Sequence, residues 1–274
     1  MKTALILGIT ADIGRELAVR LARDGWRIAG THRAGANPGP KLKSAELIGC
    51  DLDSNSSVDR AIEACRERKI AWDLLVVAAG TEEPIGPFFE CEADAWERGI
   101  GVNALAPLRF LRGIHGLRNR QGPSHVAFFS GAGTNGAAPA YSAYCASKIL
   151  LIKMCELLDA ESPDTSFFII GPGIVRTKIH RQTLAAAEKS GANYRKVVDF
   201  LQSGNPGTSH DEIYDCLQWC VGAGKSVVGG RNLSLVFDEW RQGGAALALA
   251  LKNDQHLYKL RRFGNDRKVS PPVP

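Results

Sequence analysis

The amino-acid sequence predicts an α/β protein whose parallel sheet is covered by helices on both faces. Short, continuous apolar runs, typical of strands buried on both faces, alternate with longer segments whose apolar residues recur at helical spacing. The 274 residues show no composition break and no internal repeat. We therefore expect one domain over residues 1–274, built around a seven-stranded parallel sheet.

The predicted elements alternate along the chain. Seven strands are expected at Ala4–Leu7, Trp26–Thr31, Glu46–Gly49, Leu74–Ala78, Val126–Phe129, Phe167–Ile170 and Leu233–Val236. Helices are expected between them at Gly14–Asp24, Ser57–Arg68, Ala93–Leu111 and Ser142–Ala160. Because the carboxyl ends of parallel strands meet at one edge, a binding site is expected there.

Two segments depart from this alternation. Residues 178–207 follow the sixth strand and contain two short predicted helices, Thr183–Lys189 and Tyr194–Gln202. This segment is interpreted as a substrate lid, and an inert surface insertion is the alternative. Residues 237–274 form a C-terminal extension that is basic over Lys252–Lys268.

Composition narrows the class of protein. Hydrophobic residues are 45% and charged residues 23%, which is ordinary for a soluble globular protein. The formal charge of +5 is not gathered in a dense basic stripe, so no nucleic-acid partner is expected. We find no apolar run of membrane-spanning length and no signal-peptide pattern. The seven cysteines have no metal-ligand spacing, which favours a reduced, cytoplasmic protein without a metal site.

Tyr144 and Lys148 are the most informative pair in the sequence. They lie four residues apart on a predicted helix and therefore share one face. An ammonium one turn away can lower the pKa of a phenol from about 10 toward neutrality. Such a phenol can exchange a proton with a carbonyl or alcohol oxygen. The spacing alone also fits an ordinary helix-surface pair, so other motifs must support it.

A glycine-containing turn joins the first strand to the first helix. Gly8 lets the turn close, and Gly14 lets the helix approach the strand. The middle position of the usual three-glycine pattern is Asp12. Exposed amides at the helix start, with the helix dipole, suit a pyrophosphate group. A purely structural turn is the alternative.

These motifs together resemble the short-chain dehydrogenase/reductase family, in its shorter single-domain branch, up to about Val236. Further matches are Asp51-Leu52 after the third strand, Ala79-Gly80 after the fourth, Ser130 after the fifth and Pro172–Thr177 after the sixth. The resemblance implies a Rossmann-type doubly wound fold and hydride transfer between a nicotinamide cofactor and a carbonyl or secondary alcohol. It implies cofactor contacts by Gly8, Thr10, Asp12, Ile13, Gly14, Asp51, Leu52, Ala79, Gly80, Tyr144, Lys148, Pro172, Gly173 and Thr177.

The resemblance also implies catalytic roles for four residues. Tyr144 would exchange a proton with the substrate oxygen, and Ser130 would hydrogen-bond the same oxygen. Lys148 would hold the nicotinamide ribose and lower the phenol's pKa. Asn103 would anchor a water that links Lys148 to solvent. The alternatives are an amide bonded to backbone for Asn103 and a strand-end cap for Ser130.

The spacing between the serine and the tyrosine is unusual. Ser130 stands one residue farther from Tyr144 than is commonest in the family, and the common spacing falls on Gly131. An extra residue in the glycine-rich loop after Ser130 would explain the difference. Thr134 is the substitute if that alignment is wrong. Tyr141 is a rival tyrosine, but it lacks a cation four residues later.

The end of the second strand bears on the choice of cofactor. An acidic residue there would bind the adenosine ribose and repel a 2′-phosphate. This chain has Thr31-His32-Arg33 instead. Arg33 can pair with a phosphate, so NADP(H) is favoured over NAD(H). A solvated loop arginine is the alternative.

Other functions remain open at this point. A catalytically silent regulatory or scaffold protein that kept the cofactor site is one, and an epimerase or dehydratase of the longer branch is another, disfavoured by chain length. The substrate is not readable from the sequence. The substrate pocket could be lined by Tyr194, Phe200 and Trp240, and the alternative is that these aromatic residues pack in the core. An anionic substrate could be attracted by Arg176, Lys178 and Arg181, and the alternative is a solvated basic face. A homodimer or homotetramer is expected from the resemblance.

Overall fold

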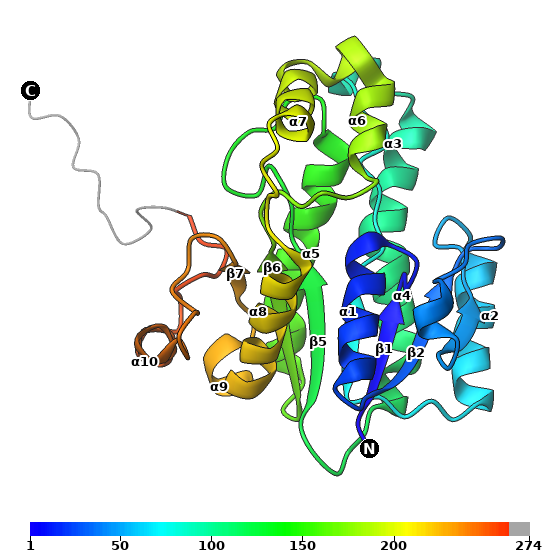
Figure 1. The fold of residues 1–274 in the computed structure, drawn as a ribbon, viewed down its shortest axis with the longest axis vertical. Helices are drawn as coiled ribbons and strands as arrows, with labels where there is room; N and C mark the ends of the chain where they lie inside the picture. Colours follow the sequence, from blue (N-terminus) through cyan, green and yellow to red (C-terminus); the bar gives the residue numbers. More distant parts are fainter. Residues whose placement is uncertain (263–274) are drawn as a thin grey trace, which may run out of the picture.

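A seven-stranded, all-parallel sheet forms the centre of the protein (Figure 1). The structure, a computed structural model, describes residues 1–262. The strand order is β3-β2-β1-β4-β5-β6-β7, so the winding reverses between β1 and β4. This is the predicted doubly wound fold. The strands are β1 (Thr3–Leu7), β2 (Arg27–His32), β3 (Glu46–Gly49), β4 (Leu74–Val77), β5 (Ser124–Phe129), β6 (Thr165–Gly171) and β7 (Asn232–Ser234).

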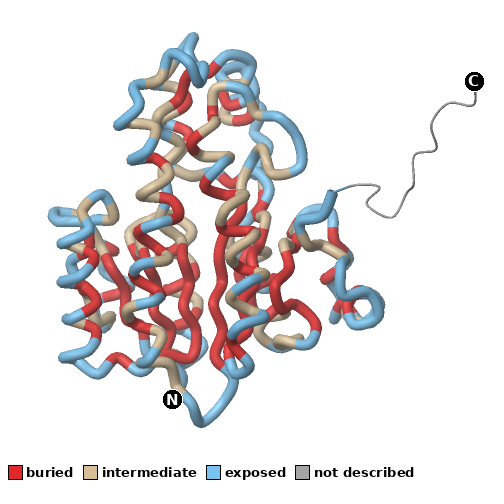
Figure 2. The backbone as a smooth tube through the Cα atoms, turned by 180° about the vertical axis from the view of Figure 1, so that it is seen from behind, coloured by how far each residue is buried: buried red, intermediate tan, exposed pale blue. Residues whose placement is uncertain are grey.

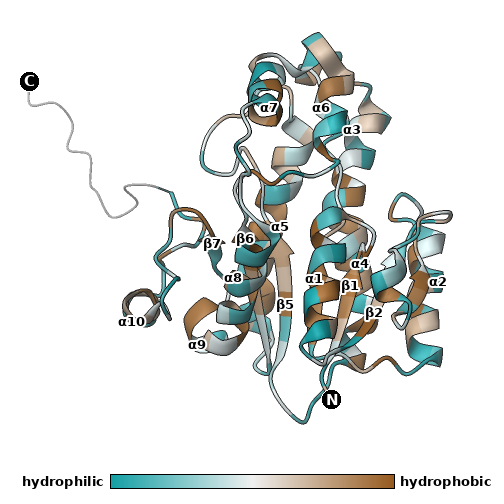
Figure 3. Cartoon of the chain, viewed as in Figure 1, coloured by the Kyte–Doolittle hydropathy of each residue, from teal (hydrophilic) through white to brown (hydrophobic). Residues whose placement is uncertain are grey.

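Helices cover both faces of the sheet. The helices α1 (Asp12–Arg23), α8 (His210–Ala223) and α9 (Lys225–Val228) lie on one face, and α2 (Asn55–Glu67), α4 (Ala106–Ile114) and α5 (Ser142–Glu161) lie on the other (Figure 1). Each face has its own apolar core. In β1, Ala4 and Ile6 belong to one core, whereas Leu5 and Leu7 belong to the other. This explains why the inner strands β1, β4, β5 and β6 are mainly apolar (Figure 3) and buried almost along their whole length (Figure 2).

The segment Ala93–Leu111 is helical throughout, as predicted, but its middle is a π-helical turn. Helix α3 (Ala93–Ile100) passes into a π-helical turn at Gly101–Leu105, and α4 begins at Ala106. The amide of Ala106 bonds to the carbonyl of Gly101, five residues back. The apolar pattern continues through the turn, and therefore periodicity does not reveal it. The turn carries Asn103 into the interior.

Helix α8 was not predicted, although its start has a recognisable signal. Ser209 accepts a hydrogen bond from the amide of Glu212, and the Glu212 carboxylate bonds back to the amide of Ser209. This capping box starts a helix whose buried face includes Ile213 and Leu217. The seventh strand is also displaced, to Asn232–Ser234 from the predicted Leu233–Val236.

Residues 178–207 lie beyond the carboxyl ends of the strands, at the top of Figure 1. They form α6 (His180–Ala186), a 3-10 turn (Ala187–Ser190) and α7 (Ala192–Gln202). In the C-terminal extension, α10 (Ala245–Asn253) lies beside α9 (Figure 1). The Arg231 guanidinium holds this region through the carbonyls of Leu251, Asp254 and Leu257. Residues 263–274 of the extension lie outside the described residues.

Three observations on residues 1–262 concern other kinds of site. No helix in this part of the chain combines the length and the apolar character that crossing a bilayer needs. No group of three or more His, Cys, Asp or Glu side chains there could hold a metal ion. All seven cysteines are free thiols.

Candidate active site

The glycine turn brings β1, α1 and β4 close together. Gly8 has a φ of 91°, and a Cβ at this residue would lie 2.7 Å from Ala79 Cβ. A Cβ at Gly14 would overlap the Gly8 carbonyl oxygen. The amide of Gly8 donates to Thr31 Oγ1 at 3.0 Å, which fixes the turn against β2. Larger side chains at these two glycines would collide with Ala79 or with the turn itself, so β1, α1 and β4 can approach this closely only with glycine there.

The start of α1 presents free amides. Its N-cap, Ala11, has no side chain that could cap the helix. Among residues 1–262, the backbone amides of Asp12, Ile13 and Gly14 have no hydrogen-bond partner. The Asp12 carboxylate instead accepts a hydrogen bond of 2.6 Å from the amide of Lys178. Three free amides at a helix N-terminus are suited to an anion.

Lys178 ties the glycine turn to the segment 178–207. Its ammonium donates to the carbonyl of Thr10 at 2.6 Å, while its amide bonds to Asp12. Arg176 is also engaged, because its guanidinium donates to the carbonyls of Phe200, Leu201 and Asn205 at the end of α7. These two cations therefore hold the segment in place, and the expectation that they face an anionic substrate is not supported.

Arg33 and Asp51 stand at the ends of neighbouring strands. The amide of Cys50 bonds to the carbonyl of His32 at 2.8 Å, which brings the ends of β2 and β3 side by side. Arg33 is exposed, and its guanidinium has no partner among residues 1–262. Asp51 accepts a hydrogen bond from the amide of Asp53 at 3.1 Å. Leu52 borders a cavity of about 400 Å³.

Asn103 lies under the loop that follows β4. The side chain is 1% exposed, and both of its polar atoms bond to the backbone of Thr81 at 2.8 Å. A Cβ at Gly80 would lie 3.2 Å from Asn103 Oδ1. The π-helical turn thus places the amide where it holds the segment Ala79–Thr81 in one position.

Tyr144 and Lys148 share one face of α5, as predicted. The Lys148 ammonium lies 5.4 Å from the centroid of the Tyr144 ring. It donates to the carbonyl of Phe129, at the end of β5, over 2.9 Å. Lys148 is 7% exposed, and burial lowers its pKa to about 8. The pair therefore sits at the carboxyl edge of the sheet, beside the end of β5.

The predicted lowering of the Tyr144 pKa is wrong for the protein by itself. Burial raises the pKa of Tyr144 above its ordinary value, and the Glu82 carboxylate and the Cys145 thiol add to the rise. The Lys148 ammonium is bonded to a carbonyl and faces the ring, so it does not offset these effects. Tyr144 is consequently a protonated phenol at neutral pH.

Gly131, rather than Ser130, lies against the Tyr144 hydroxyl. A Cβ built on Gly131 would overlap the phenolic oxygen and lie 2.6 Å from Cζ. The Ser130 hydroxyl is directed toward β6, where it would be 3.0 Å from a Cβ at Gly171. Thr134 donates to the carbonyl of Gly131 at 3.2 Å. In the sequence, this contact was indicated by the spacing to Tyr144, because the commonest family spacing falls on Gly131 and not on Ser130.

The segment after β6 is fixed by packing. Pro172 is buried, and Gly173 has a φ of 73°. A Cβ at Gly173 would lie 2.9 Å from Thr208 Oγ1. Thr177 is half-buried and directly precedes Lys178, the residue tied to the glycine turn. This segment therefore runs from the end of β6 to the first turn.

Two of the three predicted aromatic wall residues belong to the protein interior. Trp240 is 6% exposed and donates to the carbonyl of Leu235, and Phe200 is 7% exposed beside the Arg176 guanidinium. Tyr194 is 38% exposed on α7. The alternative of core packing thus holds for Trp240 and Phe200.

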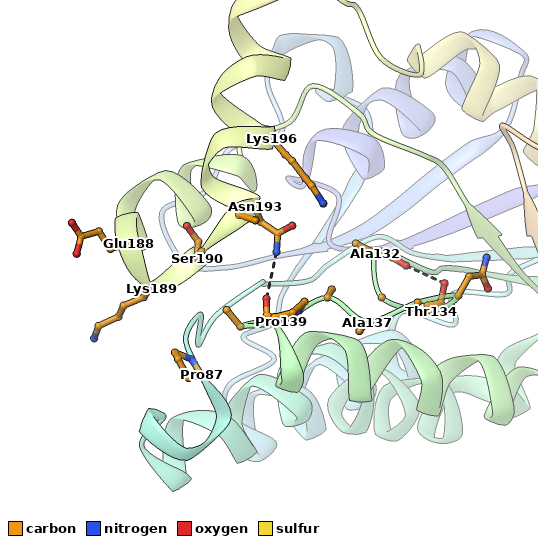
Figure 4. Close-up of a pocket in the computed structure, with 18 of the residues that line it drawn as sticks. Pro87, Ala132, Thr134, Ala137, Pro139, Glu188, Lys189, Ser190, Asn193 and Lys196 are labelled. Carbon is orange, nitrogen blue, oxygen red and sulfur yellow. Dashed lines mark hydrogen bonds between the residues drawn. The ribbon is translucent and has the colours of Figure 1, made fainter.

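A cavity of about 840 Å³ lies between the loop that follows β5 and the segment 178–207 (Figure 4). Its walls come from Gly131–Ala140 on one side and Glu188–Asn193 with Lys196 on the other, together with Pro87 and Glu90. Asn193 donates to the carbonyl of Pro139 at 3.4 Å across one end of the cavity (Figure 4). Lys196 points from α7 toward the loop (Figure 4). Because Gly131 also contacts Tyr144, the cavity adjoins the tyrosine.

Comparison with known proteins agrees with this arrangement. A family model described as short chain dehydrogenase matches residues 2–188. Estradiol 17-beta-dehydrogenase 1 of Rattus norvegicus is 29% identical over 219 residues, which cover 73% of this chain and 63% of the rat protein. The NADPH-dependent pterin aldehyde reductase of Arabidopsis thaliana is 28% identical over 187 residues, which cover 65% of this chain and 76% of that protein.

Solved structures show the same fold. A short-chain dehydrogenase/reductase from Saccharomyces cerevisiae has a TM-score of 0.75 at 20% identity, covering 90% of this chain and 99% of that one. An aldohexose dehydrogenase from Thermoplasma acidophilum has a TM-score of 0.71 at 19% identity, covering 85% and 91%. The chain belongs to the short-chain dehydrogenase/reductase family. It spans 63% of the length of the rat relative.

Proposed function

We propose that this protein is an NADP(H)-dependent oxidoreductase that transfers hydride between the nicotinamide and a carbonyl or secondary alcohol, with Tyr144 as general acid and base. The observation that carries the proposal is the position of Tyr144 and Lys148 together at the carboxyl edge of the sheet. The open glycine turn at the end of β1 lies at the same edge.

The residues around the turn fit a dinucleotide. Gly8 and Gly14 let the turn pack closely between β1, α1 and β4, and the amides of residues 12–14, unpaired among residues 1–262, suit the pyrophosphate. Thr10, Asp12 and Ile13 would border that group. Asp51 and Leu52 would border the adenine, and Ala79, Gly80, Pro172, Gly173 and Thr177 would border the nicotinamide end.

The proposed chemistry divides between cofactor and protein. A bound nicotinamide would supply or accept the hydride. Tyr144, protonated in the protein by itself, is ready to give a proton to the oxygen of a carbonyl substrate. Lys148, with a pKa of about 8, would hold the ribose hydroxyls and favour the phenolate that forms. Asn103 would hold the loop after β4 in a fixed position through its hydrogen bonds to Thr81.

The second hydrogen bond to the substrate oxygen is assigned to Ser130. Its hydroxyl is directed toward Gly171, away from the Gly131 position that contacts the phenol. A change of the Ser130 rotamer would bring its hydroxyl toward the oxygen, and Thr134 is the other donor on the same loop. Comparing Ser130→Ala with Thr134→Ala in kcat distinguishes them, because only the true donor stabilises the developing charge.

The preference for NADP(H) rests on Arg33. Its guanidinium is exposed at the end of β2 without a partner among residues 1–262, and the strand end carries no acidic side chain. A 2′-phosphate would form charge-assisted hydrogen bonds with it. The Arabidopsis thaliana relative is named an NADPH-dependent enzyme, which agrees with this choice.

Further parts of the proposal concern organisation. Residues 1–274 would form one domain, in which residues 178–207 act as the substrate lid and residues 237–274 as the C-terminal extension. The protein would be cytoplasmic and would assemble as a homodimer or homotetramer, which sedimentation of the purified protein tests.

Tyr144→Phe tests the function. The variant should bind NADPH like the wild type but lose turnover of every ketone, sugar or acyl substrate that the wild type reduces. Tyr214→Phe is the control, because Tyr214 lies on α8 and bonds to Asp24, away from the site. Full turnover by Tyr144→Phe would refute the mechanism. NADPH binding with no turnover by the wild type on the whole panel would favour the silent regulatory protein.

A further inference from the structure

Glu82 is a half-buried carboxylate in the loop after β4, two residues beyond Gly80. Its Oε2 accepts a hydrogen bond of 2.9 Å from the Thr183 hydroxyl on α6. Among residues 1–262, no donor bonds to its Oε1 and no cation pairs with the carboxylate. A carboxylate oxygen without a protein donor is available to accept a hydrogen bond from a bound molecule.

Hydrogen bonds link the carboxylate to the start of α5. The hydroxyl of Tyr141 lies 2.7 Å from Thr183 Oγ1. Since the Thr183 proton is given to Glu82, Tyr141 donates to Thr183, and the chain runs from Tyr141 through Thr183 to Glu82. Tyr141 is the N-cap residue of α5 and stands three residues before Tyr144.

The position of Glu82 is fixed by its backbone. Its amide donates to Gln182 Oε1 at 2.7 Å, and Gln182 Nε2 donates to Thr81 Oγ1 at 2.9 Å. Asn103 holds both backbone groups of Thr81. Because these bonds come from α6 and from the π-helical turn, the carboxylate has little freedom to turn toward solvent.

The electrostatics agree with this position. Burial raises the pKa of Glu82 despite the Thr183 hydrogen bond and the nearby His180. The Glu82 charge in turn raises the pKa of both Tyr141 and Tyr144. The titratable groups that face Glu82 are thus Tyr141, Tyr144 and His180, and no Lys or Arg of residues 1–262 pairs with its carboxylate. A negative charge near the reacting centre disfavours an anionic substrate there.

We propose that Glu82 is a substrate-binding residue whose free oxygen accepts a hydrogen bond from a hydroxyl next to the reacting carbon. The substrates would be hydroxylated carbonyl compounds or the corresponding diols, and compounds with a carboxylate next to the carbonyl would be rejected. This assignment rests on the proposed oxidoreductase function and names its substrate class.

Three carbonyl compounds that differ in one group test the assignment: acetophenone, 2-hydroxyacetophenone and phenylglyoxylate, each with NADPH. The wild type should prefer the hydroxyketone to acetophenone by about 10- to 100-fold in kcat/KM, the range for a hydrogen bond to a charged group. It should reject phenylglyoxylate. Glu82→Gln keeps the shape and removes the charge, so the preference should shrink at least about tenfold and phenylglyoxylate should become a better substrate.

Glu83→Gln is the matched control, because Glu83 is the next residue and its side chain is exposed. It should keep the wild-type preference. Equal use of acetophenone and the hydroxyketone by the wild type would overturn the assignment, as would an unchanged preference in Glu82→Gln. Thermal unfolding checks that each variant is folded.

A binding measurement separates this inference from the proposed function. The thermal shift caused by each compound is recorded in the presence of NADPH. A larger shift with the hydroxyketone than with acetophenone, lost in Glu82→Gln, supports the binding role even if no compound is turned over. Equal shifts overturn it. Absence of turnover of all three compounds and of the wider panel would instead count against the oxidoreductase.

Discussion

Gly131 offers a direct test of the catalytic geometry. A methyl group at this position would overlap the Tyr144 hydroxyl oxygen and lie 2.6 Å from Cζ and 2.7 Å from Cε1. These contacts are far inside van der Waals range, so in Gly131→Ala the phenol must leave its place. The backbone itself permits alanine, because Gly131 has no positive φ.

The size of the effect follows from the contacts. Inserting one methyl group into a filled space costs about 1–3 kcal/mol, which lowers Tm by roughly 2–10 °C in a domain of this size. The loss of activity should be larger, since a well-placed general acid contributes about 10²- to 10⁴-fold. We expect kcat to fall by about 100-fold or more while NADPH binding is kept.

The assay is NADPH consumption with a substrate that the wild type reduces, combined with thermal unfolding. Gly122→Ala is the control, because Gly122 lies in the loop before β5, away from the cavity, has no positive φ and a Cβ there would meet no atom within 4 Å. It should keep both Tm and kcat. If Gly131→Ala were as active as Gly122→Ala, the position of Tyr144 against Gly131 would not be the one used in catalysis.

Three further outcomes are expected. Arg33→Ala should weaken NADPH binding about 10- to 100-fold by calorimetry and leave NADH binding unchanged. Arg60→Ala also removes an exposed arginine without a partner among residues 1–262 and should change neither affinity. Equal losses for both cofactors would contradict the NADP(H) preference. Burial lowers the pKa of His125 from 6.5 to about 4. As the pH falls, the unfolded chain therefore protonates His125 at a higher pH than the folded protein does. About 3 kcal/mol of the free energy of unfolding should be lost between pH 6.5 and pH 4. Denaturant unfolding of His125→Leu over the same pH range should not show this loss. Asn103→Ala leaves the Thr81 amide and carbonyl unpaired and should cost about 2 kcal/mol or more in urea unfolding; an unchanged midpoint would show that water replaces the amide.

Much of the sheet was predictable because burial on both faces leaves a strong local signal. The strand β4 was expected at Leu74–Ala78 and runs over Leu74–Val77. The capping box at Ser209 is an equally local signal for α8, and hydrophobic periodicity does not reveal it. The π-helical turn at Gly101–Leu105 left no such trace, since one extra residue per turn hardly disturbs an apolar pattern.

The sequence by itself determined the doubly wound fold, the glycine turn and the pairing of Tyr144 with Lys148, because each depends on residues that are neighbours along the chain or along a helix. Only the tertiary structure decided the protonation of that pair. Burial and the Glu82 carboxylate raise the pKa of Tyr144, and the Phe129 carbonyl holds the Lys148 ammonium. It also decided that Gly131 contacts the phenol. These effects depend on solvent exclusion and on atoms brought together from distant loops, which no spacing in the sequence encodes.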